Sequence, residues 1–245
     1  AYYRNNFFSL INLLSAYKEA SINFVFSSSC TVYGQPDSLP VTESAPVKKA
    51  ESPYGNTKQI AEEILAEIAS VNKNYNIVAL RYFNPVGAHE TALIGELPIG
   101  VPQNLVPFIT QTAIGKREKI TVFGDDYNTP DGSCIRDYIH VVDLAKAHVA
   151  AIKRMEEGKS ADNYEVFNIG TGKGTTVLEI INAFEKSTGQ KLNYIIGPRR
   201  SGDIEQIFGD ATKSSKVLGW TAELNVEDMM KSAWEWEKYI AKNPF

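Results

Sequence analysis

A tyrosine and a lysine stand four residues apart in the segment SPYGNTK, residues 52–58. On a helix this spacing brings Tyr54 and Lys58 to one face. Because a tyrosine ordinarily titrates at about pH 10, it can act as a base near neutral pH only where a positive charge favours its phenolate. A lysine one turn away supplies such a charge, and the pair could then remove a proton from an alcohol.

The context of the pair matters, because chance alone produces about one Tyr/Lys pair at this spacing in a chain of this composition. Pro53 is typical of the first turn of a helix. Upstream, the run Ser27-Ser28-Ser29-Cys30 ends a stretch of strand-forming residues. A serine hydroxyl from this run could face the phenol.

The elements that must position these residues alternate between strand and helix, and this alternation predicts a parallel sheet. The first part is expected to contain a helix at 6–20, a strand at 23–28, a helix at 54–71 and a strand at 77–82. The later part is expected to be mixed, with helices at 105–115, 141–155, 177–188 and 226–241. Short strands are expected near Thr121, at 164–169 and at 192–196.

The composition favours a soluble cytoplasmic enzyme, with 43% hydrophobic residues and a net charge of −4, which argues against a nucleic-acid partner. Cys30 and Cys134 lack metal-ligand spacing, as do His89, His140 and His148, so reduced thiols and no metal are expected. No apolar stretch approaches the roughly 18 residues of a membrane helix, so no membrane partner is expected.

Five segments, in order along the chain, resemble the extended short-chain dehydrogenase/reductase family and, within it, the UDP-glucose (UDP-galactose) 4-epimerases. They are SSSCTVYG at 27–34, SPYGNTK at 52–58, RYFNPVGA at 81–88, RDYIHVVD at 136–143 and PRRSGD at 198–203. The resemblance implies an α/β fold with a Rossmann-like, doubly wound parallel sheet, truncated at its N-terminus, and a smaller mixed α/β substrate domain. Residues 1–84 would be the remainder of the NAD-binding domain. Residues 85–245 would be mainly the UDP-sugar domain, with returns to the first.

The family differs from this chain at the start, because it opens with a strand, a glycine-rich turn and a helix that hold the dinucleotide pyrophosphate. Here Gly34 is the only glycine before Gly55. We therefore expect a fragment that lacks about the first third of the enzyme and is inactive alone. The glycines at 170–174 do not have the spacing of a phosphate loop. They are expected to form a structural turn before a helix capped by Thr176 and Glu179.

The resemblance implies interconversion of UDP-glucose and UDP-galactose, a step of galactose metabolism. The hydrogen on C4 of a hexose is not acidic, so inversion there requires hydride chemistry. NAD would take the C4 hydride while Tyr54 takes the hydroxyl proton, and the 4-keto sugar would turn over before the hydride returns. Ser29 would donate a hydrogen bond or relay the proton, and Lys58 would lower the pKa of Tyr54 and bind the nicotinamide ribose.

The resemblance also assigns binding residues. Asn5 and Phe83 would help Ser29, Tyr54 and Lys58 hold NAD. Arg136 and Arg200 would clamp the pyrophosphate, and Asp203 would accept ribose hydroxyls. The remaining residues expected along the substrate route, besides Ser29 and Tyr54, are Asn84, Asn104, Leu105, Phe123 and, beside the hexose, Ile207.

Two other functions compete with epimerisation. A 4,6-dehydratase would need an added acid and base next to the serine position, where this chain has Ser28 and Cys30. A non-catalytic nucleotide-sugar or NAD-binding protein would have lost part of the Ser29, Tyr54 and Lys58 set, which is complete here.

A homodimer is also expected, through an intersubunit four-helix bundle of the helices at 6–20 and 54–71. Its expected apolar residues are Leu10, Leu13, Leu14, Ile60, Ile64 and Ile68.

Overall fold

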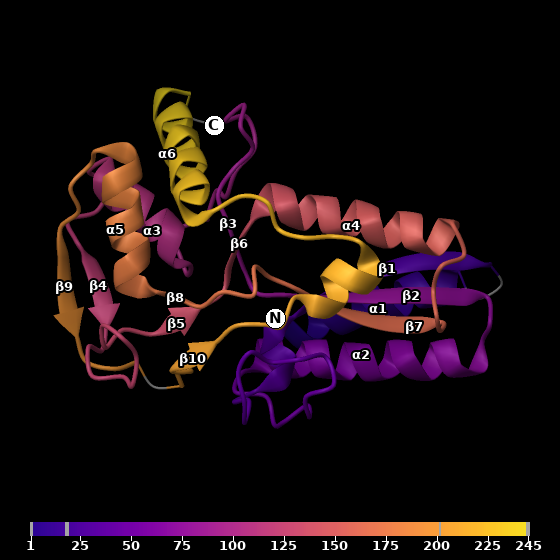
Figure 1. Cartoon of the computed structure of the whole chain (residues 1–245). Coiled ribbons are helices and arrows are strands. Elements are labelled where there is room, and N and C mark those ends of the chain that lie inside the picture. Colours follow the sequence, from indigo (N-terminus) through magenta and orange to yellow (C-terminus); the bar gives the residue numbers. More distant parts are fainter. Residues whose placement is uncertain (1, 18–19, 201, 244–245) are drawn as a thin grey trace. The chain divides into compact units, whose positions relative to one another are not determined.

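The computed structural model describes residues 2–17, 20–200 and 202–243. The chain divides into two compact units, coloured along the sequence in Figure 1. Unit 1 comprises Ala1–Phe83, Lys146–Ile169 and Gly209–Thr221. Unit 2 comprises Asn84–Ala145, Gly170–Phe208 and Ala222–Phe245.

Unit 1 is built on a parallel sheet in the order β1-β2-β7, formed by Ile22–Ser29, Tyr75–Tyr82 and Tyr164–Ile169. In the register of this sheet Ser29 lies opposite Tyr82, and Tyr82 lies opposite Ile169. The carboxyl ends of the strands therefore finish side by side, which is where open α/β sheets place their functional groups. This part of the chain has the expected α/β fold.

Helices cover both faces of the unit 1 sheet. α1 (Tyr2–Ala16) and α2 (Pro53–Val71) pack on one face, where Leu10, Leu65 and Ile77 belong to one buried apolar cluster. Most of α4 (Val141–Glu156) belongs to this unit and covers the opposite face from α2 (Figure 1). The 3-10 helix η1 (Cys30–Tyr33) follows β1 directly, and the π-helical turn η2 (Ser214–Leu218) contacts β7.

The start of α2 follows the sequence prediction. The Ser52 hydroxyl accepts a hydrogen bond from the Gly55 amide at 3.1 Å, and Pro53 is the first helical residue, where its missing amide hydrogen costs nothing. The prediction for α1 was shifted, because the helix begins at Tyr2 and ends at Ala16. Part of the predicted end, at positions 18 and 19, lies outside the described residues.

Unit 2 has short paired strands instead of one sheet. β3 (Asn84–Val86) pairs in parallel with β6 (Tyr138–His140), and β4 (Ile120–Phe123) pairs in parallel with β9 (Tyr194–Gly197). β5 (Ile135–Arg136) lies between β10 (Gln206–Ile207), which is parallel to it, and β8 (Thr175–Thr176), which is antiparallel.

Three helices enclose the core of unit 2, namely α3 (Leu105–Ala113), α5 (Val177–Thr188) and α6 (Val226–Lys242). Phe184 of α5 meets Trp234 of α6 edge to face, with ring centres 5.8 Å apart. α5 begins at the predicted capping box, in which the Thr176 and Glu179 side chains each bond the other residue's backbone amide.

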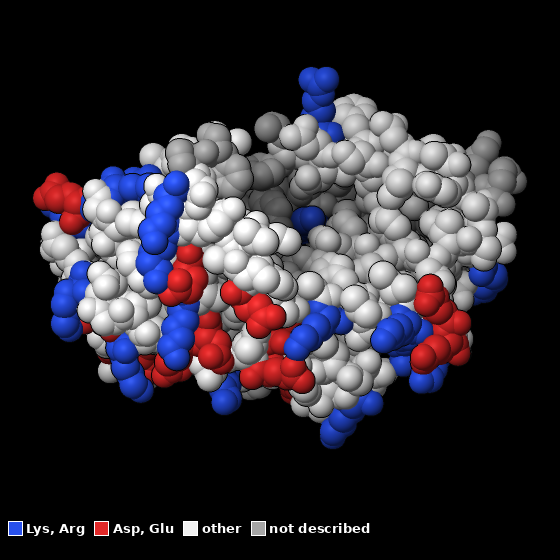
Figure 2. All heavy atoms as spheres, turned by 90° about the horizontal axis from the view of Figure 1, so that it is seen from above, with Lys and Arg blue, Asp and Glu red and all other residues white. Residues whose placement is uncertain are grey.

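Acidic and basic side chains are interspersed on the face shown in Figure 2, in keeping with the small net charge. Among residues 2–17, 20–200 and 202–243, no helix is long and apolar enough to cross a membrane. Within the same residues, no group of three or more His, Cys, Asp or Glu side chains is arranged to hold a metal ion.

Candidate active site

Ser29 and Tyr54 meet at the carboxyl end of β1. Ser29 is the last residue of that strand and the cap of η1, where its Oγ accepts hydrogen bonds from the Thr31 amide at 3.2 Å and the Thr31 hydroxyl at 3.0 Å. Tyr54 is the second residue of α2, and its half-buried side chain lies near the side chain of Ser29, which acts to lower the pKa of Tyr54. The structure thus joins two of the three residues expected to be catalytic.

Two opposing influences act on the pKa of Tyr54 in the protein alone. Burial raises the pKa of Tyr54 above its ordinary value, and the hydrogen bond with Ser29 only partly offsets this. Lys58 Nζ lies 5.6 Å from the centre of the Tyr54 ring and donates to the Ser27 carbonyl oxygen at 2.8 Å. Burial lowers the pKa of Lys58 itself. The protein part of the site therefore favours the neutral phenol.

A second hydroxyl lies beside this site. The Tyr82 hydroxyl donates to Ser27 Oγ at 2.7 Å and lies 2.5 Å from Nε2 of His148 on α4. Burial raises the pKa of Tyr82 to about 12, so this phenol stays neutral at physiological pH. Ser27 thus connects Lys58, through its carbonyl, with Tyr82, through its hydroxyl.

The two further residues expected to hold NAD differ in their surroundings. Asn5 is exposed on α1, and its backbone carbonyl accepts a hydrogen bond from the Ser9 hydroxyl. Phe83 is buried directly after β2, and its amide donates to the Ile169 carbonyl at 3.1 Å. The Phe83 ring packs so closely on Gly209 that a side-chain carbon there would lie 2.5 Å from it.

In unit 2 the structure brings together five residues expected to bind substrate. Asp203 accepts from Arg200 Nη2 at 2.8 Å and Nε at 3.2 Å, and more loosely from Arg136 Nη2 at 3.5 Å. The Arg200 guanidinium carbon lies 5.4 Å from the centre of the Phe123 ring. Ile207 is the register partner of Arg136 across β10 and β5. The cluster carries two positive charges and one negative charge.

The other three expected substrate residues lie outside this cluster of contacts. Asn104 precedes α3, and its Nδ2 donates to Glu96 Oε1 at 2.7 Å. Leu105 begins α3 and packs against the apolar core of unit 2, so its contacts are those of a core residue. Asn84 begins β3, and its amide donates to the Asp137 carbonyl oxygen at 2.9 Å.

Comparison with known proteins identifies the family. A family model described as GDP-mannose 4,6 dehydratase matches residues 1–233. UDP-glucose 4-epimerase 1 of Oryza sativa subsp. japonica is 46% identical over 245 residues, covering 100% of this chain and 68% of the relative. The NAD-bound UDP-glucose 4-epimerase structure from Stenotrophomonas maltophila superimposes with a TM-score of 0.93 at 46% identity, covering 97% of this chain and 70% of that one.

The chain belongs to the UDP-glucose 4-epimerases of the extended short-chain dehydrogenase/reductase family. The enzyme from Bifidobacterium longum, solved with NAD+ and UDP, agrees, with 48% identity, a TM-score of 0.91 and coverage of 99% of this chain and 71% of that one. This chain spans only part of its relatives' length, 65% in the case of UDP-glucose 4-epimerase 4 of Oryza sativa subsp. japonica.

The glycine-rich turn of this epimerase chain, residues 170–174, is held by a protein carboxylate. Asp137 is fully buried, and it accepts from the amides of Thr171 at 2.8 Å and Gly172 at 3.1 Å and from the Thr171 hydroxyl at 2.7 Å. These amides would be the donors in a phosphate loop. Their use by Asp137 agrees with the prediction of a structural turn.

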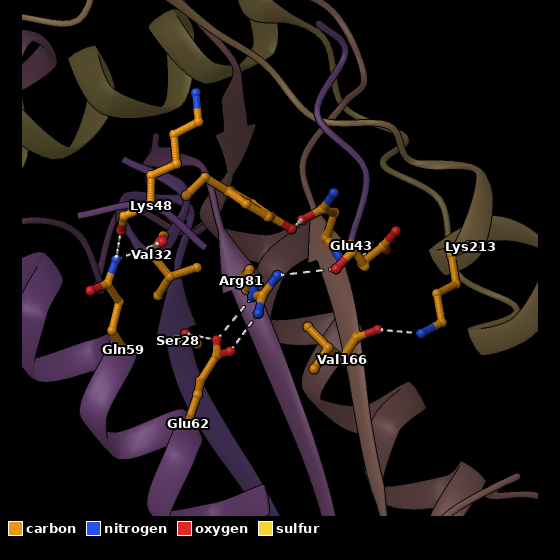
Figure 3. A network of polar contacts seen from close by, with 11 residues as sticks. Ser28, Val32, Glu43, Lys48, Gln59, Glu62, Arg81, Val166 and Lys213 are labelled. Atoms are coloured by element: carbon orange, nitrogen blue, oxygen red, sulfur yellow. Dashed lines mark hydrogen bonds and ion pairs between the residues drawn. The ribbon is translucent and has the colours of Figure 1, made fainter. Parts of the chain in front are cut away.

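The polar network next to Ser29 and Tyr54 was missed by sequence reasoning. Glu62 of α2 accepts from the Ser28 hydroxyl at 2.5 Å and from two nitrogens of Arg81, as Figure 3 shows. On the preceding turn of the same helix, Gln59 Nε2 donates to the Val32 and Lys48 carbonyls. The available signal was the spacing, because Glu62 lies eight residues after Tyr54 and so shares its helix face.

Proposed function

We propose that the complete protein interconverts UDP-glucose and UDP-galactose with NAD as cofactor, as a step of galactose metabolism. The observation that carries this proposal is the meeting of Ser29, Tyr54 and Lys58 at the carboxyl ends of parallel strands, in a chain that belongs to the epimerase family. The relatives solved with NAD bound support the cofactor.

The chemistry of the donors fits the nicotinamide end of NAD. A half-buried ammonium and a half-buried phenol at strand ends can donate to ribose hydroxyls, and this edge of an open α/β sheet is where dinucleotides bind. Lys58 and Tyr54 would hold the ribose, with Phe83 and Asn5 as further contacts. When bound in its oxidised form, the cofactor supplies a hydride acceptor and a positive charge.

We propose that Tyr54 accepts the proton from the C4 hydroxyl. In the protein alone burial opposes the phenolate, while the Ser29 hydroxyl stabilises it. Lys58, 5.6 Å from the ring centre, adds a positive charge on the same side of the helix. Additional positive charge next to the phenol would favour the phenolate further. We therefore assign Tyr54 as base, Ser29 as its hydrogen-bonding partner and Lys58 as the ribose and electrostatic contact.

The charged cluster of unit 2 suits a nucleoside diphosphate. Arg136 and Arg200 share the single carboxylate of Asp203, which leaves one positive charge for an anion. A pyrophosphate would gain planar guanidinium donors, and Asp203 would become available to ribose hydroxyls. Asn84, Asn104, Leu105 and Phe123 are proposed as further contacts, and Ile207 as the residue next to the hexose.

Under this proposal the two units have different tasks. Residues 1–84, together with the later segments of unit 1, would bind NAD, and most of residues 85–245 would bind the UDP-sugar. Cys30 and Cys134 are buried thiols, which supports a reducing compartment and hence the cytoplasm.

A 4,6-dehydratase is the nearest alternative, because the matching family model carries that description. Elimination of water needs an acid and a base beside the serine position. Here the positions next to Ser29 are Ser28, whose hydroxyl donates to Glu62, and Cys30, which is buried, so neither is a carboxyl group. A non-catalytic NAD- or nucleotide-sugar-binding protein would give no turnover at all. The products formed from UDP-galactose distinguish both alternatives from epimerisation.

The assay uses the protein from the complete reading frame that encodes this chain. UDP-galactose is added with and without NAD, and the products are separated and identified by NMR. We expect an equilibrium mixture with UDP-glucose that requires bound or added NAD. A 4-keto-6-deoxy sugar would establish the dehydratase instead, and binding without any product would establish the non-catalytic protein.

We also propose a homodimer through α1 and α2. Leu10 and Leu14 are buried within one subunit and cannot form the interface, which corrects part of the expected face. Phe8 and Ile11 of α1 are exposed, as is Leu13, and they supply an apolar face. Phe8→Glu should convert the dimer to a monomer in analytical ultracentrifugation, whereas Val71→Glu, at an exposed position at the end of α2, should not. A monomeric parent protein at micromolar concentration would contradict the pairing.

A further inference from the structure

Glu62 is a buried carboxylate to which the proposed mechanism gives no task. It lies on α2 two turns after Tyr54 and one turn after Lys58, so the three side chains share a helix face. Glu62 is only 7% exposed. Because glutamate is rarely buried without a partner, its burial calls for an explanation. The contacts that Glu62 makes explain its position.

The two oxygens of Glu62 hold the residues that precede the active-site ends of two strands. Ser28, the residue before Ser29, donates its hydroxyl to Oε1 at 2.5 Å. Arg81, the residue before Tyr82, donates from Nε to Oε1 at 3.0 Å and from Nη2 to Oε2 at 2.5 Å. Ser28 and Arg81 are register partners, as are Ser29 and Tyr82. Figure 3 shows Glu62 reaching from α2 to both strands.

The groups around this carboxylate keep the Arg81 guanidinium in place. The guanidinium carbon lies 4.7 Å from the centre of the Tyr33 ring, and Nη1 lies 3.5 Å from the Glu43 carbonyl oxygen. Tyr164 of β7 also faces Glu62, and burial raises the pKa of both tyrosines, so neither adds a negative charge near neutral pH. Although burial opposes it, hydrogen bonding to Glu62 keeps the pKa of Arg81 above its ordinary value.

A buried ion pair is weak evidence for stability, because removing two charges from water costs about as much as their attraction returns. An apolar pair could fill the same space. An apolar pair has no directional contacts. The hydrogen bonds from Ser28 and Arg81 to Glu62 do have a direction, so they fix the position of α2 along the axis of β1. Tyr54 and Ser29 sit on these two elements and must meet within hydrogen-bonding distance.

We propose that Glu62 and Arg81 are positioning residues that hold α2 and β1 in the register at which the Ser29 hydroxyl meets Tyr54. The geometric part of this inference stands on the structure alone. Its consequence for turnover rests on the proposed epimerase function.

Two variants test the proposal, and a third variant serves as a matched control. Glu62→Gln keeps the shape and removes the charge, and Ser28→Ala removes one contact while leaving the ion pair intact. The control is Glu165→Gln, because Glu165 of β7 forms a comparably buried pair in the same unit with two nitrogens of Arg154, at 2.8 and 2.9 Å. The Arg154 pair connects α4 with β7, whereas the Glu62 contacts connect α2 with β1 and β2.

The first measurement does not depend on activity. NMR of isotope-labelled tyrosine gives the fraction of ionised Tyr54 at one alkaline pH at which circular dichroism shows every variant folded, with Tyr54→Phe assigning the signal. Because Ser29 lowers the pKa of Tyr54, both test variants should reduce the ionised fraction. Glu165→Gln should leave it unchanged. An unchanged Tyr54 in both test variants, or an equal change in the control, would overturn the proposal. Should Glu62→Gln not fold, Ser28→Ala decides.

The second measurement is the turnover of UDP-galactose by the protein from the complete reading frame. A displacement of about 1 Å in a reacting group can cost about a hundredfold in rate, so kcat should fall by up to that factor in Glu62→Gln while KM changes little. A Glu62→Met/Arg81→Met double variant should regain thermal stability without regaining kcat. Recovery of kcat in this double variant would overturn the proposal. If the parent protein has no activity, the proposed function fails, and the NMR result alone decides whether Glu62 positions Ser29.

Discussion

Lys58 directs its ammonium group at the backbone carbonyl of Ser27, 2.8 Å away, and not at the hydroxyl of Tyr54. The ammonium nitrogen still lies 5.6 Å from the centre of the Tyr54 ring. The side chain that lowers the pKa of Tyr54 is that of Ser29. Ser29 thus acts to lower the pKa of Tyr54, whereas Lys58 is bonded to the backbone at the end of β1.

The first prediction concerns the phenol itself. Tyr54→Phe in the complete protein should lower the turnover of UDP-galactose by about a hundredfold to ten-thousandfold, the usual contribution of a general base. Tyr75→Phe is the matched control, because this buried phenol donates to the Leu14 carbonyl, at 3.3 Å, within the core of unit 1. A Tyr54→Phe variant with turnover within about twofold of the parent would remove Tyr54 from the role of base.

The second prediction concerns pH. The base must be deprotonated, so activity should rise with pH as the Tyr54 phenolate forms. Because the hydrogen bond from Ser29 lowers the pKa of Tyr54, Ser29→Ala should raise that pKa and move the rising limb of the pH–rate profile to higher pH. Ser9→Ala, on the exposed face of α1, should leave the limb in place. A limb that moves to lower pH in Ser29→Ala would contradict the assigned direction.

The third prediction separates two neighbouring arginines. Arg200→Met removes a guanidinium from the unit 2 cluster and should raise the KM for UDP-galactose by about ten- to a hundredfold, since hydrogen bonds to charged groups contribute about 1.5–3 kcal/mol. Arg199 instead pairs with Asp126 and lies over the Tyr127 ring. Arg199→Met should therefore change KM little. Equal effects of the two substitutions in steady-state kinetics would argue against Arg200 as a specific phosphate contact.

The fourth prediction concerns the choice of sugar. Ile207 is 3% exposed and intermediate in size, so UDP-glucose and UDP-galactose should be the main substrates and UDP-N-acetylglucosamine a weak one. Ile207→Ala should increase turnover of the N-acetyl sugar relative to UDP-galactose, and Ile207→Tyr should abolish it. Ile207→Tyr is also expected to cost about 1–3 kcal/mol of stability through overpacking, so melting temperatures accompany the assay.

Leu192→Ala is the control for this series, since it opens a cavity in the same unit among core residues. It should lower stability without changing the preference between the two sugars. If the parent and both Ile207 variants handled the N-acetyl sugar alike, Ile207 would not control access of the substituent on C2.

Local signals in the sequence explain which elements could be predicted. α5 was predicted with its observed bounds, Val177–Thr188, because a capping box begins it and Gly189, in the left-handed conformation, ends it. β5, β8 and β10 are two residues long, too short to show the alternation that marks a strand. The early start of α1 coincides with tertiary contacts, in which Tyr2 packs on Tyr54 and Tyr3 accepts a hydrogen bond from Asn56.

The residues of the candidate site also divide into those that the sequence could predict and those that it could not. The spacing of Tyr54 and Lys58 and the serine run upstream pointed to residues that the fold does bring close together. Spacing could not reveal that burial raises the pKa of Tyr54, because desolvation depends on packing from distant segments. Glu62 was overlooked for the same reason, since a glutamate on a helix is usually solvated and only the register of β1 and β2 places Ser28 and Arg81 against it.

The fate of the hydrogen on C4 tests the central claim most directly. The complete protein is incubated with UDP-galactose in deuterium oxide, and the UDP-glucose formed is examined by NMR and mass spectrometry. If hydride leaves C4 and returns without reaching solvent while Tyr54 handles only the hydroxyl proton, the product carries no deuterium at C4. Deuterium at C4 of the UDP-glucose, or a failure to form UDP-glucose when NAD is present, would contradict the account.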